Sequence, residues 1–525
     1  MATEKFSSLQ GSTRRAFIRQ ALCAAVGTSA LSNTIRDLRY INVAMAQSAP
    51  AISDYKALVC IFLNGGNDAN NLIIPTIAEE YANYANIRTP ALALPNAGVT
   101  GGALSLNITN GSGDGHSYGF HPACTELQAL FNNRKLTTVF NVGTLVYPIT
   151  KAEYTSGAVS RPPQLFSHAD QQQQWQTSIS DRPQATGWGG RCADLLDTYN
   201  PKNGNTSVLS MCISLAGANL FEVGGVVQQY NVSTSGAASL NPNYPPSAAR
   251  SAQTLALNNI IGIDAVQANM LTQNYALALD HALDSGTSLT AALAGTKMAT
   301  YWANTYPKNV VVPNGGGTIF NASLLAQLQM VAKSIEAGYR AASSNNGLGM
   351  KRQIFFVQVG GYDLHTGQTN NSGQTTTNNA TVVLGAQANL LAELSQGLNA
   401  FQNALQTIGS TYGDSSFDSR VTTFTSSDFG RTLPCNGLGS DHGWGSHHLV
   451  MGGSVNGGRT YGKFPALVVG GPDDTSTGRW IPTTSVDQFA ATMASWFGVD
   501  NSKMATVFPN LGRFSVPNLG FLNSI

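Results

Sequence analysis

The chain carries little charge: 11% of its 525 residues are Asp, Glu, Lys or Arg, and the formal net charge is +1. This balance gives no electrostatic case for binding nucleic acid or an anionic membrane surface. Hydrophobic residues make up 42% of the chain and glycines number 54, so the surface must be polar through uncharged side chains. This composition is typical of a core-forming protein and suits an exported bacterial one.

Two common site motifs are missing. The six cysteines show no C-x-x-C spacing, which argues against a thiolate zinc site. The glycine-rich turn FLNGGNDANN lacks the G-x-G-x-x-G pattern, which argues against a dinucleotide-binding site. If the protein has a metal or catalytic site, its ligands must come from other residue types.

The N-terminus predicts an export signal. Arg14 and Arg15 stand just before a weakly apolar stretch from Ala21 to Leu31, which is too short to span a hydrocarbon layer of roughly 30 Å. The sequence AMAQ offers a cleavage site after Ala46. Residues 1–46 are interpreted as a twin-arginine signal peptide, the alternative being a cytosolic amphipathic helix. The mature protein is expected in the periplasm or outside the cell, with no stable membrane span.

Apolar runs alternate with helical patterns along the remaining residues 47–525, which are interpreted as one domain. Long helices are predicted at about 322–342 and 385–408, each directly before a strand. This alternation predicts an α/β fold with a mainly parallel sheet, whose ligands bind at the carboxyl ends of the strands. A polar segment at about 230–320 is interpreted as an insertion or cap. Strands are predicted at 57–66, 136–145, 353–365, 420–430 and 464–471.

Polar residues follow several of these strands. Asp363 and His365 stand two apart in an extended segment, so they face one side, as two ligands of one cation must. Seven of the eight histidines fall in such clusters, which favours a shared polar active site over histidines that merely hydrogen-bond loops. The candidate positions are Asn64, Asp68, Asn70, Asp114, His116, His121, Ser167, His168, Asp170, Asp363, His365, Asp428, Arg431, Asp441, His442, His447 and His448.

Carboxylate and imidazole ligands without thiolates fit zinc, manganese or a similar dication. Two neighbouring ions would clamp a phosphoryl or sulfuryl group, and Arg431 would hold a spare oxygen of that group in a fork geometry. The alternative for Arg431 is a salt bridge to Asp428.

The twin-arginine start, ALVCIFLNGGNDANNLIIP, LFSHADQQQQWQT, GWGGR, GGYDLHTGQ, TSSDFGRT and DHGWGSHHLVMGG together resemble the exported bacterial family labelled domain of unknown function 1501. That family is similar to the alkaline phosphatase and sulfatase superfamily. The resemblance implies a three-layer α/β/α sandwich and a Ser or Thr nucleophile. It also implies one or two divalent metal ions, zinc first, with manganese, magnesium or calcium as alternatives.

Residue roles carried over by this resemblance depart from the superfamily at two positions. Asn64 stands where a metal-binding Asp is expected, and Phe429 stands where a His ligand is expected. Ser167 is the expected nucleophile and Arg431 the oxyanion holder. The expected substrate-binding residues are Asn64, Asn70 and His168, and the expected metal ligands are Asp68, Asp363, His365, Asp428, His442 and His447.

The sequence therefore predicts an exported metal-dependent hydrolase that acts on phosphate or sulfate esters, either small or polymeric. The rival hypothesis is a non-catalytic envelope or secreted protein that uses the same fold to bind a polymer or a partner. A metal-free serine esterase is the third hypothesis.

Overall fold

The structure is a computed structural model that describes residues 52–109, 114–203, 206–237, 259–262 and 270–523. The predicted signal peptide lies outside these residues. Ser53–Ile525 forms one compact unit built on a ten-stranded sheet of order β10-β9-β8-β13-β1-β14-β15-β5-β16, with β17 beside β5. The bounds of these strands are β1 Lys56–Leu63, β5 Leu136–Gly143, β8 Cys212–Ser214, β9 Tyr230–Ser233, β10 Gly236–Ala237, β13 Arg352–Val359, β14 Val421–Ser427, β15 Ser446–Met451, β16 Thr460–Tyr461 and β17 Thr484–Ser485.

Three parallel strands form the middle of the sheet. Strand β1 pairs with β13 on one side and with β14 on the other, and the last residues of the three strands are register partners. Every residue of β1 and β14 is buried, as expected for strands covered on both faces. Their carboxyl ends therefore meet at one edge of the sheet.

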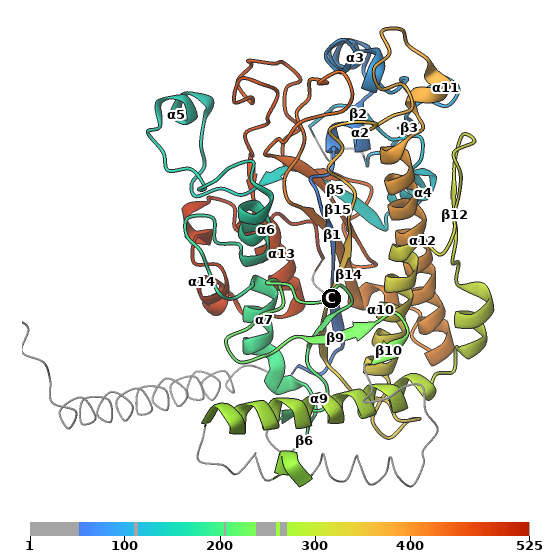
Figure 1. Ribbon diagram of the computed structural model, residues 1–525, viewed down its shortest axis with the longest axis vertical. Coiled ribbons are helices and arrows are strands. Elements are labelled where there is room, and N and C mark those ends of the chain that lie inside the picture. Colours follow the sequence, from blue (N-terminus) through green and yellow to red (C-terminus); the bar gives the residue numbers. More distant parts are fainter. Residues whose placement is uncertain (1–51, 110–113, 204–205, 238–258, 263–269, 524–525) are drawn as a thin grey trace, which may run out of the picture. The chain divides into compact units, whose positions relative to one another are not determined.

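Helices cover the two faces of this sheet (Figure 1). Val59 and Ile61 of β1 belong to a core shared with α10 and α12, whereas Cys60, which alternates with them, faces a small cavity beside Trp175 of α6 and Trp188 of α7. Because successive side chains of a strand point to opposite faces of the sheet, β1 packs against apolar side chains on both faces. The main helices are α3 Ala78–Leu92, α4 Thr125–Asn132, α5 Lys151–Ser156, α6 His168–Thr177, α7 Trp188–Leu196, α9 Met270–Ala294, α10 Ser323–Tyr339, α12 Ala386–Tyr412, α13 Val486–Phe497 and α14 Met504–Val507.

The predicted α/β class and the mainly parallel sheet are confirmed. Four of the five predicted strands correspond to β1, β5, β13 and β14, and the two long predicted helices correspond to α10 and α12. The strand predicted at 464–471 is wrong, because this segment is a loop in which Val468 and Val469 are exposed. Strand β15 runs antiparallel to both β14 and β5.

The predicted insertion at about 230–320 holds β9, β10, α9 and a hairpin of β11 (Val310–Val312) and β12 (Gly317–Ile319). Strand β9 pairs with β8, so the start of this segment extends the main sheet.

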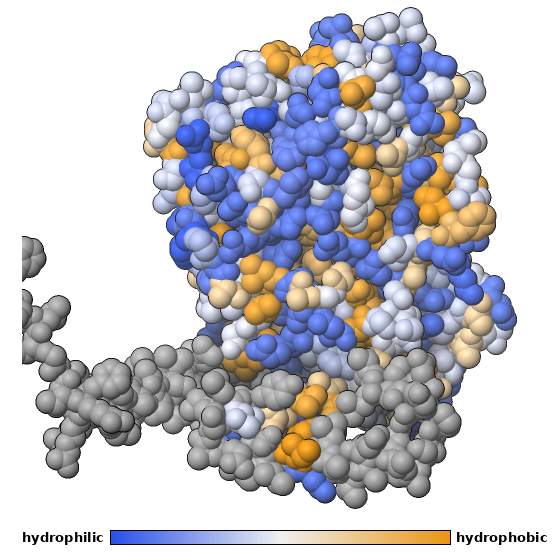
Figure 2. Space-filling view, viewed as in Figure 1, coloured by the Kyte–Doolittle hydropathy of each residue, from blue (hydrophilic) through white to orange (hydrophobic). Residues whose placement is uncertain are grey.

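Among the described helices, none is long and apolar enough to cross a membrane. Figure 2 shows mostly hydrophilic residues on the face drawn, with smaller hydrophobic groups between them.

Candidate metal centre

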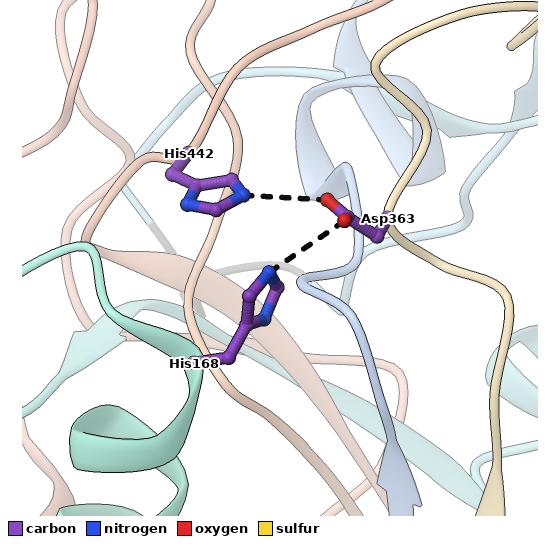
Figure 3. A group of neighbouring side chains, drawn as sticks. All are labelled: His168, Asp363 and His442. Atoms are coloured by element: carbon purple, nitrogen blue, oxygen red, sulfur yellow. Dashed lines mark hydrogen bonds and ion pairs between the residues drawn. The ribbon is translucent and has the colours of Figure 1, made fainter.

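Side chains from separate parts of the chain converge beyond the carboxyl ends of β13, β1 and β14. Asp363 follows β13, His168 begins α6, and His442 lies in the loop before β15. One ligand atom from each of these residues lies within 4.8 Å of the other two. In Figure 3 both imidazoles point toward the carboxylate of Asp363. The Nε2 atom of His442 is 3.3 Å from Asp363 Oδ1, and that of His168 is 3.7 Å from Asp363 Oδ2.

The far nitrogen of each ring is held by an acceptor. Nδ1 of His168 lies 2.6 Å from Oδ2 of the fully buried Asp428, and Nδ1 of His442 lies 2.8 Å from the carbonyl oxygen of Phe166. A carbonyl can only accept, so Nδ1 of His442 carries the proton. Burial lowers the pKa of His442, which favours the neutral ring. Its Nε2 therefore presents a lone pair to the cluster.

A third imidazole borders the same point. Nδ1 of His365 lies 3.0 Å from Oδ1 of Asp441, while its Nε2 lies 3.0 Å from Nε2 of His442 and 3.2 Å from Oδ1 of Asp363. All three rings thus direct Nε2 inward and anchor Nδ1 on a carboxylate or a carbonyl. This is the arrangement that protein metal sites use to fix the tautomer of a histidine ligand.

Arg431 supplies the positive charge that the cluster contains. Its side chain is buried and donates to Asp363 Oδ1 at 2.5 Å, to the Gly66 carbonyl at 3.0 Å and to the Tyr362 carbonyl at 3.2 Å. Burial opposes ionisation of Asp363, but the charge and hydrogen bond of Arg431 outweigh it and lower the pKa of that carboxyl. The salt bridge considered between Arg431 and Asp428 is therefore wrong, since the ion pair is with Asp363.

The donor set fits a divalent cation. The Nε2 atoms of His168 and His442 both face the carboxylate of Asp363, and two imidazole nitrogens with a carboxylate oxygen are ligands that a divalent cation accepts. Zinc–nitrogen bonds of about 2.0–2.1 Å place tetrahedral ligand atoms about 3.3 Å apart, and the three candidate ligand atoms here lie within 4.8 Å of one another. The three residues that would hold an ion are therefore His168, Asp363 and His442, with His365 adjoining them.

Two glycines make room for this arrangement. Gly65 and Gly66 follow β1 with φ of 117° and 85°. A Cβ on Gly65 would lie 2.5 Å from the backbone nitrogen of Asp363, and one on Gly66 would lie 2.6 Å from the ring of Phe429. That ring is buried and packs 4.8 Å from the His168 ring and 4.6 Å from the His442 ring. Phe429 is thus a wall of the site that supports two candidate ligands.

Asp428, a predicted ligand, is occupied by protein donors. Besides His168, it accepts from the Gly65 amide at 3.2 Å and from Gln172 Nε2 at 3.0 Å. Gln172 also donates to Asn64 Oδ1 at 2.6 Å. Gln172 therefore links Asn64 to Asp428 through hydrogen bonds. Asp428 lies at the Nδ1 side of the His168 ring, away from Asp363.

Two other predicted residues have structural partners. Asp68 is buried and pairs with the fully buried Arg88, and it also caps α2 (Ala69–Leu72) through the amide of Asn70. The Asn70 side chain donates to the Arg431 carbonyl at 2.9 Å and accepts from Trp480 at 2.8 Å. Asp68 and Asn70 hold the loop after β1 in place and do not belong to the three-residue group.

Ser167, the predicted nucleophile, is the N-cap of α6 and directly precedes His168. Its hydroxyl donates to Asp170 Oδ2 at 2.7 Å. Ser167 as a residue is partly exposed. Its assignment as nucleophile stays a prediction.

The remaining clustered histidines lie apart from the group. His447 is on β15 between the rings of Phe140 and Phe464, and its Nδ1 accepts from the Asn141 amide at 3.1 Å. Burial lowers the pKa values of His121, His447 and His448 to about 3. These three rings are neutral core residues, and His116 instead pairs with Glu80 at 2.5 Å.

One G-x-S-x-G sequence is present at residues 115–119. Its Ser117 is exposed in the loop directly before β4 (Tyr118–Phe120), whereas a nucleophile elbow lies between a strand and a helix. The local structure thus gives no support to a metal-free serine esterase at this position.

Sequence reasoning missed the residues that orient the ligands. Asp441 was noted only as part of a cluster, and Phe166 and Gln172 were not singled out at all. Phe166 contributes a backbone carbonyl, which no side-chain pattern reveals. Its φ of 74° is unusual for a bulky residue and marks strain at the edge of the site.

The fold and site together define an α/β protein with a candidate metal centre of two histidines and an aspartate. The chain belongs to the family described as "Protein of unknown function (DUF1501)", which it matches over residues 55–513. No curated protein matches the sequence. Among solved structures it is similar to a mutant of alkaline phosphatase PafA, with 11% sequence identity and a TM-score of 0.22. That alignment covers 73% of this chain and 64% of the phosphatase chain, so this chain spans less than two thirds of that protein.

Proposed function

We propose that the protein is an exported, metal-dependent hydrolase of phosphate or sulfate esters. The observation that carries this proposal is the convergence of His168 and His442 on Asp363, with each far ring nitrogen anchored on an acceptor. The chemistry that a bound dication supplies at such a site is Lewis-acid polarisation of an ester oxygen. Zinc suits two imidazoles and a carboxylate best.

In this proposal Ser167, Asp170 and Arg431 have separate roles. Ser167 is the nucleophile, and the Asp170 carboxylate that accepts its hydrogen bond is the group placed to take its proton. Ser167 also caps the ten-residue helix α6, whose N-terminal amides favour developing negative charge. Arg431 donates from Nε and Nη2 to Asp363 and two carbonyls, and its Nη1 lies 3.4 Å from His365 Nε2, so in this proposal it holds Asp363 and borders the third imidazole.

The test is hydrolysis of chromogenic phosphate monoesters, phosphodiesters and sulfate esters by chelator-treated protein before and after zinc is added back. Turnover is expected only with the metal. Ser167→Ala is expected to lower kcat by at least about 10³-fold while metal content stays the same. The matched control is Ser156→Ala, since Ser156 is exposed on α5. Undiminished turnover by Ser167→Ala would refute the assignment of Ser167 as the nucleophile.

The rival function, non-catalytic binding of a polymer or partner, is favoured by one observation. Phe429 fills space against both His168 and His442, where the superfamily resemblance implies another metal ligand. An inert ester panel with metal bound, together with capture of a cell-surface polymer, would support this rival over hydrolysis.

A further inference from the structure

We infer that the site binds a substrate carrying a second oxyanion, and that a pocket beside the metal centre holds this group through Arg161, which lines the pocket, and Arg479, which stacks on the ring of the lining residue Phe166. This inference rests on the proposed function, because it concerns the substrate of the same site. The pocket has a volume of about 460 Å³ and lies along the segment between α5 and α6. Tyr154, Arg161, Leu165 and Phe166 are among its lining residues.

The pocket and the metal centre share Phe166. The carbonyl of this residue accepts from His442 Nδ1, and its side chain lines the pocket. Arg479 lies over the Phe166 ring, 4.2 Å from its centroid, and donates from Nε to the His442 carbonyl at 2.8 Å. The pocket therefore adjoins the residue whose carbonyl anchors His442.

One stacked guanidinium lines this pocket, and a second is stacked on the ring of the lining residue Phe166. Arg161 is exposed, and its guanidinium lies 4.9 Å from the centroid of the Tyr154 ring. The Arg479 guanidinium lies over the Phe166 ring in the same way, at 4.2 Å. Stacking on a ring uses the face of a guanidinium and leaves N–H groups on its edge for an oxyanion. Arg161 gives one of them to the Tyr154 carbonyl at 3.5 Å, and Arg479 gives its Nε–H to the His442 carbonyl. The described residues that line the pocket include no acidic side chain to neutralise these charges.

The backbone of this segment is strained. Gln164 and Phe166 have φ values of 53° and 74°, in the left-handed region that favours glycine. Such strain persists where the surroundings fix the conformation, and it is typical of ligand-binding sites. A wall held in this way offers a preformed surface for the second oxyanion.

The whole chain is nearly neutral, so general charge attraction does not account for anion binding. The test measures binding of sucrose octasulfate by full-length, chelator-treated protein, with uncharged sucrose as the reference. Inositol hexakisphosphate in a second arm distinguishes a phosphate ligand from a sulfate ligand. Because no turnover or metal is involved, failure here is distinguishable from failure of the hydrolase proposal.

The expected result is binding of at least one polyanion, weakened at least about tenfold in Arg161→Gln/Arg479→Gln, with no binding of sucrose. Arg182→Gln, at an exposed arginine paired with Asp181, is the matched control and is expected to bind like wild type. Equal binding by the double variant and wild type, or no binding of either polyanion, would overturn the inference. If a polyanion binds but none of the chromogenic esters is hydrolysed, the anion-binding pocket is supported and the hydrolase proposal is rejected.

Discussion

The imidazole of His168 and the carboxylate of Asp428 form a hydrogen bond of 2.6 Å, and this contact turns Nε2 of His168 toward Asp363. Asp428 has no exposed surface, whereas the side chain of Asp363 is 46% exposed. The buried carboxylate thus orients a candidate ligand, and the accessible carboxylate is the one placed to bind an ion.

Asp428→Asn should weaken zinc binding by roughly 10- to 100-fold, because the amide no longer fixes the His168 tautomer with a full negative charge. Competition with a chromogenic chelator measures this affinity. Asp280→Asn, at an exposed position of α9, is the control. An unchanged affinity in Asp428→Asn would mean that the His168 orientation has no bearing on metal binding.

Gly66→Ala should destabilise the protein by about 2–4 kcal/mol, because the new Cβ meets the Phe429 ring at 2.6 Å. Gly98→Ala is a matched control, since Gly98 has the same φ of 85° but nothing within 4 Å of an added Cβ. The Gly98→Ala variant should lose only about 1 kcal/mol of unfolding free energy. Chemical denaturation measures both, and equal losses would show that Phe429 is not held tightly.

His447→Leu should leave the metal content unchanged, because the His447 ring lies between Phe140 and Phe464 on β15. The Asn141 amide loses its acceptor, so stability should fall by about 1–3 kcal/mol. Elemental analysis and thermal unfolding separate the two effects. Loss of metal from a variant that remains folded would restore His447 as a ligand.

Asp487 should make stability depend on pH. Both its oxygens are buried without a hydrogen-bond partner among the described residues, and burial raises its pKa from 3.8 to about 7. A raised pKa in the folded state favours the fold below pH 3.8, and this contribution is lost as the pH rises to about 7. Asp487→Asn should therefore raise Tm, by about 2 °C or more above pH 7 and by less at pH 4. A gain that does not change with pH would contradict this account.

Much of the architecture follows from local patterns. Continuous apolar runs predicted β1, β13 and β14 because these strands are buried on both faces, and polar residues just after them marked the site. The run at 464–471 misled because its valines are exposed, a property that depends on tertiary packing. Apolar composition alone cannot distinguish such a loop from a short strand.

The residues of the site were predicted better than their roles. Asp363, His168, His365 and His442 do converge, as expected from loops at the carboxyl ends of neighbouring strands. The partner of Asp68 could not be foreseen, because Arg88 lies in α3 and nothing in the sequence connects the two. Likewise, only the fold shows that Asp428 faces an imidazole nitrogen rather than the centre of the cluster.

The metal content of the purified full-length protein tests the central claim most directly. Elemental analysis should find about one equivalent of a divalent transition metal in wild type, and less than about a tenth of an equivalent in folded His168→Ala/His442→Ala. Less than about half an equivalent in wild type after zinc is supplied, or equal metal in the double variant, would contradict a metal centre at His168, Asp363 and His442.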